Sequence, residues 1–487
     1  MFDFENLTTR KLADARSLLG RKAGLLAGCL SLLLLASCAV GPDYRRPAMA
    51  NIPPSYGWKV AEPSDDKIKG DWWKLFHDPD LDHLEAQATG ANPGIQEAAA
   101  RVDQSRAVAR IEKSQFFPQI SLEPSAQRFR TPPTAVPPNF TANIYTLPLD
   151  LSYEIDIWGR VRRSFESAQA EAQATVADYS MVLLSLHGDV ATNYFLLRQL
   201  DAEVDILQRT LRLRRTALEI LQERFSGGLA TGSDVDEART QMELTQTQVY
   251  EAQRERGNLQ DALALLCGEA APIFSLKPGP STATIPDVPI GLPASLLERR
   301  PDIAAAERRM AAANAKIGVA YAAFFPAVSL TGEAGYSSFT TATLLSWQSR
   351  LFSIGPEVVL PILTGGRTEA QVKQARADYN LTCAEYRQTV LSGFRDVSDS
   401  LNDLHSYREQ TTSLGRAVKA AQAATNTSNQ SYTQGLVNYL NVVDAERVEL
   451  EAELQQVQAA SLTRVATVHL IKALGGGFEV SNKTAAK

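Results

Sequence analysis

The sequence is poor in the residues from which most disulfide frameworks, metal centres and active sites are built. Its 487 residues include four cysteines and five histidines. Cys267 and Cys383 are isolated in helical surroundings and the histidines are scattered, so neither a disulfide framework nor a metal site is predicted. No Ser/His/Asp set is attached to a motif, and Gly475–Gly477 follows a helix instead of opening one. We therefore expect no catalytic residues and no enzyme.

The sequence also lacks an excess of positive charge and, after the leader, long apolar runs. The formal net charge is −6, which argues against nucleic acid or an anionic lipid as the main partner. After the leader, no run of about eighteen consecutive apolar residues occurs, so a membrane-spanning helix is not predicted. If the chain crosses a membrane, it has to do so as β-strands.

The leader itself predicts a lipoprotein signal. An apolar stretch, Ala23–Leu35, follows several basic residues and is too short to span a bilayer as a mature helix. It ends in Leu35–Cys38, the pattern at which bacteria cleave and lipidate, so we expect Cys38 to carry a covalent lipid and no other cofactor to be bound. Ala39, rather than an aspartate, follows the cysteine, which in Gram-negative lipoproteins favours the outer membrane. The alternative is a plain signal peptide with an unmodified cysteine.

The remaining chain repeats itself. Phe116–Pro118 recurs as Phe324–Pro326, 208 residues later (from position 116 to 324), and Gly228-Leu229 recurs as Gly435-Leu436. Each half is predicted to run helix, strand, strand, long helix, turn, helix. We divide the chain into a signal peptide (1–37), a lipidated N-terminal segment with an equatorial region (38–90), a first repeat (91–268), a linker (269–294), a second repeat (295–475) and a tail (476–487).

The strands are the candidates for crossing a membrane. In Tyr145–Ile157, apolar and polar residues alternate over thirteen positions, which exceeds the about 9 to 11 that a spanning strand needs. Three further strands are predicted at Gln119–Arg130, Ala327–Phe339 and Phe352–Ile362, with hairpin loops at 131–139 and 340–350. Four strands cannot close a barrel, and lipid tolerates no open sheet edge, so several copies would have to share one. The alternative is a soluble hairpin domain with one buried face.

Two runs almost free of proline and glycine predict very long helices. Arg160–Phe225 and Arg367–Tyr432 would each form a rod of about 100 Å. Returning helices are expected at Asp234–Cys267 and Leu440–Leu474, and shorter helices at Asn92–Ser114 and Leu296–Ala320. One copy could not bury such rods, so we expect them to pack against other subunits. An antiparallel coiled-coil spacer is the alternative.

Several motifs together resemble one family. They are Cys38–Pro47, Asp71–Phe76 with Asp78-Pro79, Arg299–Ile303, Ala311–Gly318 and Ala322–Pro326. The chain is similar in these motifs to the outer membrane factors of Gram-negative tripartite efflux systems, specifically the NodT-type lipoproteins. The resemblance implies an α+β membrane protein in which four transmembrane β-strands per chain contribute to a trimeric 12-stranded β-barrel. A long periplasmic α-helical barrel would continue it, with a small mixed equatorial region around Trp72-Trp73 and the C-terminal end.

The resemblance also implies a function. The homotrimer would be a passive exit duct, joined by a periplasmic adaptor to an inner-membrane resistance-nodulation-division (RND) transporter. The adaptor would dock on the two helical turns, at Gly228, Leu229, Ala230 and Thr231 and at Gly435, Leu436, Val437 and Asn438. Related channels often narrow this end with carboxylates, but Val437 occupies such a position here. The candidate gate is therefore Tyr432, Tyr439 and Asp444, which could instead merely pack neighbouring helices. The alternative function is a periplasmic coiled-coil adaptor or scaffold lipoprotein.

Overall fold

The computed structural model describes residues 39–45, 70–286 and 300–476. Cys38, the predicted lipidation site, lies outside the described residues. The chain forms two compact units. Unit 1 comprises Met1–Ala48, Asp103–Ala174 and Glu307–Glu385, and unit 2 comprises Met49–Val102, Thr175–Ala306 and Tyr386–Lys487.

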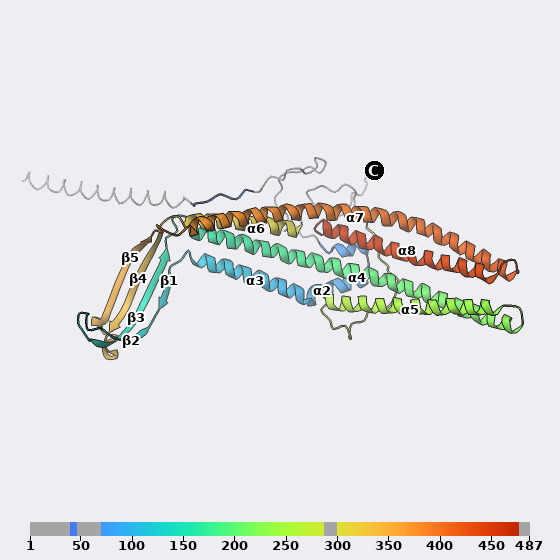
Figure 1. Cartoon of the computed structure of the whole chain (residues 1–487), viewed down its shortest axis with the longest axis horizontal. Coiled ribbons are helices and arrows are strands. Elements are labelled where there is room, and N and C mark those ends of the chain that lie inside the picture. Colours follow the sequence, from blue (N-terminus) through green and yellow to red (C-terminus); the bar gives the residue numbers. More distant parts are fainter. Residues whose placement is uncertain (1–38, 46–69, 287–299, 477–487) are drawn as a thin grey trace, which may run out of the picture. The chain divides into compact units, whose positions relative to one another are not determined.

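Unit 1 contains one antiparallel sheet (Figure 1). Its strands are β1 (Gln119–Leu122), β2 (Ser125–Arg130), β3 (Thr141–Glu154), β4 (Ala327–Ser338) and β5 (Arg350–Val359). β1 and β2 both pair with β3, followed by β4 and β5, so the β1/β2 side and β5 form the two edges. The prediction of a single strand over 119–130 is wrong, because the structure has two strands there. They are divided at Glu123-Pro124, where proline has no N–H to donate to the ladder.

The register gives the sheet two different faces. One face, called the apolar face below, contains a rung formed by Leu122, Leu149, Ala334 and Phe352. The adjacent rung, on the acidic face, is formed by Ser121, Asp150, Glu333 and Ser353. This confirms the alternation predicted for β3. Apolar residues stay exposed in the single chain, with Phe352 at 76% and Ile120 at 69% of full exposure.

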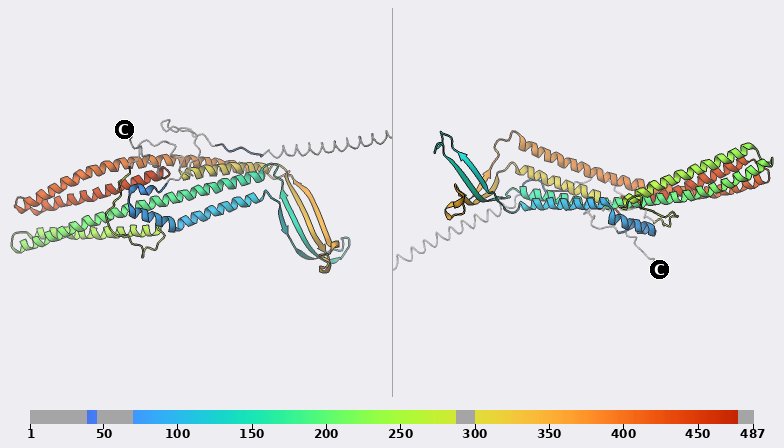
Figure 2. Two further views of the ribbon diagram at one scale, coloured as in Figure 1. Left: turned by 180° about the vertical axis from the view of Figure 1, so that it is seen from behind. Right: turned by 90° about the horizontal axis from the view of Figure 1, so that it is seen from below.

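The helices follow the predicted pattern closely. The model contains α3 (Pro93–Ser114), α4 (Arg160–Ser226), α5 (Gly232–Leu266), α6 (Pro301–Ala322), α7 (Arg367–Thr433) and α8 (Tyr439–Ala473). Only α6 differs by more than two residues, because its predicted start at Leu296 lies outside the described residues. Figures 1 and 2 show α4 running beside α5, and α7 beside α8, as two hairpins. Within the described residues, no helix is both long enough and apolar enough to cross a membrane.

The described N-terminal segment, residues 39–45, is fixed within unit 1. Gly41 approaches α6 so closely that a Cβ built on it would lie 2.6 Å from the Cα atom of Gly318. Asn314 of α6 donates its side-chain N–H to the Pro42 carbonyl at 3.0 Å. Arg163 of α4 forms an ion pair with Asp43 at 2.8 Å. The segment therefore lies where α4 and α6 meet the strands.

The largest apolar core belongs to unit 2 and includes two elements that the sequence did not predict. These are the 3-10 helix Trp72–Phe76 and α2 (Pro79–Ala91). Phe76 packs on Phe195 of α4, with ring centroids 5.0 Å apart. Asp78 caps α2 and also accepts a hydrogen bond from the Tyr194 hydroxyl at 2.8 Å. The N-terminal elements are thereby tied to α4.

Candidate functional site

The turn between α4 and α5 presents one exposed leucine on a fixed backbone. Gly228 has a φ of +71°, a conformation that favours glycine. The N–H of Leu229 donates to the Arg224 carbonyl at 2.8 Å, which closes α4. Thr231 and Asp234 form a reciprocal capping box that opens α5. The Leu229 side chain remains 81% exposed.

The turn between α7 and α8 has the same construction. Gly435 has a φ of +73°, and the Leu436 N–H donates to the Ser431 carbonyl at 2.9 Å. The Asn438 side chain accepts from the backbone N–H of Asn441 at 3.3 Å, capping α8. Leu436 is 72% exposed, while Val437 is half-buried. The duplication therefore yields two matching surfaces, each with a projecting leucine.

A small apolar core joins the two hairpins just behind these turns. It contains Leu218, Leu221, Val235, Ala238, Tyr439, Val442 and Val443, with Tyr432 packed against it. The rings of Tyr432 and Tyr439 are 5.6 Å apart, and the Arg224 guanidinium lies 5.3 Å from the Tyr432 ring centroid. Burial, followed by the charge of Glu446, raises the pKa of Tyr439 to about 12.

The three candidate gate residues do not form one cluster. Tyr432 and Tyr439 are in contact, whereas Asp444 is exposed and pairs with Arg447, one helical turn away, at 3.5 Å. Arg224, which the sequence analysis did not select, contacts Tyr432 instead. The tyrosines thus link the end of α4 to the start of α8.

A buried arginine behind the turns also escaped the sequence analysis. Arg214 is 6% exposed and donates to the Gln241 carbonyl at 3.0 Å and to the Thr245 hydroxyl. Burial lowers its pKa, which the charge of Glu446 opposes. The signal was available, since Arg214 falls in the apolar stripe of Leu207, Leu211, Leu218 and Leu221, at spacings of three and four.

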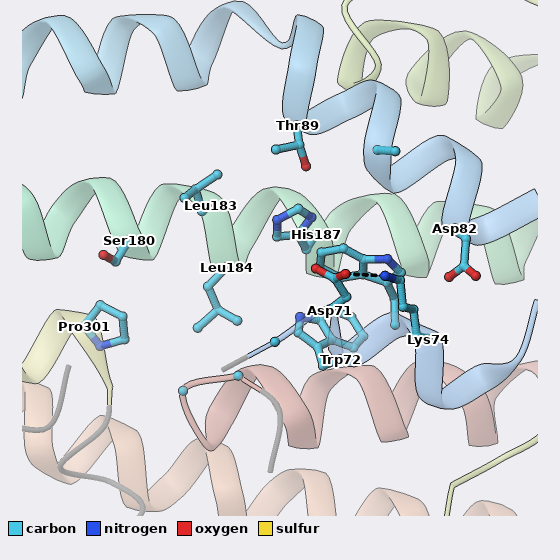
Figure 3. A pocket seen from close by; sticks show the side chains of 15 residues that line it. Asp71, Trp72, Lys74, Asp82, Thr89, Ser180, Leu183, Leu184, His187 and Pro301 are labelled. Carbon is cyan, nitrogen blue, oxygen red and sulfur yellow. Dashed lines mark hydrogen bonds and ion pairs between the residues drawn. The ribbon is translucent and has the colours of Figure 1, made fainter. Parts of the chain in front are cut away.

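Further along unit 2, His187 takes part in lining a pocket of about 450 Å³ (Figure 3). Leu183, Leu184 and His187 of α4 line it together with Trp72 and an Asp71–Lys74 ion pair. Burial lowers the pKa of His187 to about 4.

The partner of His187 is a fully buried glutamate. The Nδ1 atom of His187 lies 2.7 Å from Oε2 of Glu85, and burial raises the pKa of Glu85 well above its usual value. The other carboxyl oxygen of Glu85 has no hydrogen-bond partner within the described chain. Both shifts favour a neutral Glu85 that donates its proton to a neutral His187.

The described residues contain no group of three or more His, Cys, Asp or Glu side chains arranged to hold a metal ion. Cys267 is buried, which raises its pKa to about 11, and Cys383 is half-buried. Cys267 therefore lacks the lowered pKa that marks a reactive cysteine.

A family model for outer membrane efflux proteins matches residues 84–269 and 292–476 of this chain. The chain belongs to that family. The match falls once on each half of the chain, and membership confirms the family recognised from the motifs. It favours the outer-membrane component of an efflux system over a periplasmic adaptor or scaffold.

Individual relatives agree with the family assignment. The solvent efflux pump outer membrane protein SrpC of Pseudomonas putida is 34% identical over 462 residues, covering 93% of this chain and 98% of SrpC. Outer membrane protein OprJ of Pseudomonas aeruginosa is 31% identical over 471 residues, covering 93% and 96%.

Solved structures are similar over most of this efflux protein. The outer-membrane channel OprN has a TM-score of 0.83 at 31% identity and covers 90% of this chain and 99% of its own. The outer membrane protein VceC of Vibrio cholerae has a TM-score of 0.78 at 28% identity, covering 84% and 99%. The strands and long helices described above are thus those of outer membrane channels.

Proposed function

We propose that three copies of this efflux protein form a passive exit duct, in which four strand positions per chain make a shared 12-stranded barrel. The observation that carries the proposal is the sheet of unit 1, which has one apolar face, one acidic face and two unpaired edges. Relatives named as outer membrane proteins of efflux pumps, SrpC among them, support export as the role.

The edges supply the physical argument. An unpaired backbone N–H or C=O costs several kcal/mol in hydrocarbon. β5 and the β1/β2 side each expose a row of such groups, which only another strand can satisfy. The apolar face would contact lipid and the acidic face would line the channel. Because the strand positions per chain are too few for closure, neighbouring copies would complete the wall.

The two helical turns would dock a periplasmic adaptor that connects the duct to an inner-membrane RND transporter. Leu229 and Leu436 are exposed on turns that lead into the side-chain caps Thr231 and Asn438, and exposed leucines suit a partner with apolar grooves. The Tyr432–Tyr439 contact behind them would be part of the gate. Asp444, already paired with Arg447, would contribute less.

Lipidation of Cys38 would add an anchor. The segment that follows it is fixed where the helices meet the strands. That is the level of the inner leaflet if the helices extend into the periplasm. The indole N–H of Trp158 donates to the Pro326 carbonyl at the same level, and tryptophans are common at membrane interfaces.

The duct is tested by extraction and conductance. The protein should leave the outer membrane only with detergent, behave as a trimer in native mass spectrometry, and produce discrete conductance steps in a planar bilayer. A monomer that salt alone extracts would contradict the proposal and favour a scaffold role.

Docking is tested separately with Leu229→Asp and Leu436→Asp. Both side chains are exposed, so the variants should assemble and conduct normally but fail to restore efflux in a strain lacking the channel. Val136→Asp is the matched control, because Val136 is 97% exposed in the hairpin loop between β2 and β3. Full efflux by both turn variants would refute the docking assignment.

A further inference from the structure

The apolar face of the sheet ends in arginines. Arg128 pairs in register with Asn143, and Arg130 pairs with Thr141. Arg350, the first residue of β5, pairs with Tyr336. All three belong to the parity of the apolar face and lie toward the hairpin loops, away from the helices. These arginines are the only charged residues of that face within β1–β5.

Acidic residues are confined to the opposite face. The carboxylates of β1–β5 are Asp150, Glu154, Glu333 and Glu357, and the register assigns each of them to the acidic face. In the part of the chain that the structure describes, no carboxylate pairs with Arg128 or Arg130. Arg350 donates its Nε–H to the Trp347 carbonyl at 2.8 Å and lies over the Trp347 ring. The three charges are therefore not neutralised within the sheet.

The arginines also occupy opposite edges. β2 carries Arg128 and Arg130 on one edge, and β5 carries Arg350 on the other. If copies close edge to edge as proposed above, Arg350 of one copy and Arg128 and Arg130 of the next flank the same seam. Three guanidinium groups at one seam repel one another unless an anion lies between them.

We propose that each seam binds the phosphate groups of a phosphorylated lipid in the outer leaflet, so that a trimer holds three such lipids. This inference rests on the proposed barrel. The ligand has to be amphipathic, because the apolar face beneath the arginines exposes Phe352 at 76% and Ile354 at 56%. Acyl chains would cover these side chains while arginines contact the phosphates, for which the guanidinium geometry is suited. The negative net charge argued against an anionic lipid as the main partner. The proposed contact depends instead on the local positive charge of the three arginines.

The test uses the trimer in detergent and native mass spectrometry, with lipid A bearing two phosphates as the probe and lipid A stripped of both phosphates as the comparison. The wild type should bind up to three phosphorylated molecules per trimer. The variant Arg128→Gln/Arg130→Gln/Arg350→Gln should lose at least about tenfold in affinity, since each site loses charge-assisted hydrogen bonds. The control variant is Arg101→Gln/Arg106→Gln/Arg254→Gln, whose exposed arginines pair along their own helices. It should bind like the wild type.

Conductance of the same samples separates this inference from the proposed function. A trimeric, conducting protein that binds both probes equally, or whose sheet variant keeps wild-type affinity, overturns the lipid site alone. A wild type that neither assembles nor conducts overturns the barrel and the lipid site together. Phosphate-dependent binding that the sheet variant loses and the control variant keeps supports the site.

Discussion

Replacing Glu85 by glutamine should change how the stability of this efflux protein depends on pH. In the wild type, Glu85 and His187 lie 2.7 Å apart and share one proton. The pKa of His187 falls from 6.5 to about 4, while that of Glu85 rises well above 4.5. These two shifts have opposite consequences for folding.

The sign follows from counting protons. As the pH falls below 6.5, unfolded His187 takes up a proton that the folded protein accepts only near pH 4. The effect of His187 alone would therefore be to make the folded protein less stable as the pH falls. As the pH rises above 4.5, unfolded Glu85 releases a proton that the folded protein keeps. The effect of Glu85 alone would therefore be to make the folded protein less stable as the pH rises. Between pH 4.5 and 6.5 the pair carries one proton in both the folded and the unfolded state, so its contribution to stability does not change with pH.

Glu85→Gln removes one side of this balance. The variant should lose stability as the pH falls from 6.5 to about 4, by up to about 3 kcal/mol per protomer at about 1.4 kcal/mol per pKa unit. Above pH 6.5 the variant should not show the decline in stability that Glu85 causes in the wild type.

The assay is thermal unfolding of detergent-solubilised protein, followed by circular dichroism at several pH values between 4.5 and 8. The gap in melting temperature between variant and wild type should widen toward acid. Glu97→Gln, at an exposed position of α3, should show no pH-dependent gap. Parallel pH profiles for wild type and Glu85→Gln would refute the shared-proton interpretation.

Three further predictions concern the sheet and the anchor. A Cβ on Gly335 would lie 2.1 Å from the Leu147 carbonyl oxygen, so Gly335→Ala should greatly reduce trimer yield on native gels. Gly355→Ala, with no atom within 4 Å of its Cβ, should not. Asp150→Asn should lower the preference for K⁺ over Cl⁻ in reversal-potential measurements, because Asp150 faces Glu333 on the acidic face; an unchanged potential would contradict a channel lining there. Cys38→Ser should abolish incorporation of labelled palmitate, and persistent labelling would exclude Cys38 as the acceptor.

Periodicity predicted the large elements well. The long helices are uninterrupted by proline, and the glycines at 228 and 435 stand where helices end, so α4, α5, α7 and α8 are found within two residues of their predicted bounds. The predicted ends of the strands were less accurate. β3 stops at Glu154 instead of Ile157, and Asp156 caps α4 by accepting from the N–H groups of Val161 and Arg162.

Contacts between distant residues could not be predicted in the same way. Glu85 and His187 are 102 positions apart, and neither carries a local signal for burial. The same holds for Arg224 and Tyr432, which meet only because two hairpins pack side by side. The turn residues were found because backbone geometry demands glycine and capping side chains locally. Partnerships inside the core depend on tertiary packing, which no short pattern encodes.

Cross-linking between the sheet edges tests the central claim most directly. Ser125→Cys on β2 and Ser353→Cys on β5, combined in a Cys383→Ser background, place thiols on the two edge strands and on the same face. A short thiol-specific cross-linker applied to outer membranes should convert this variant to covalent dimers and trimers on denaturing gels. A variant that carries only one of the two introduced cysteines should remain monomeric. Recovery of monomers alone would show that neighbouring copies do not close the barrel.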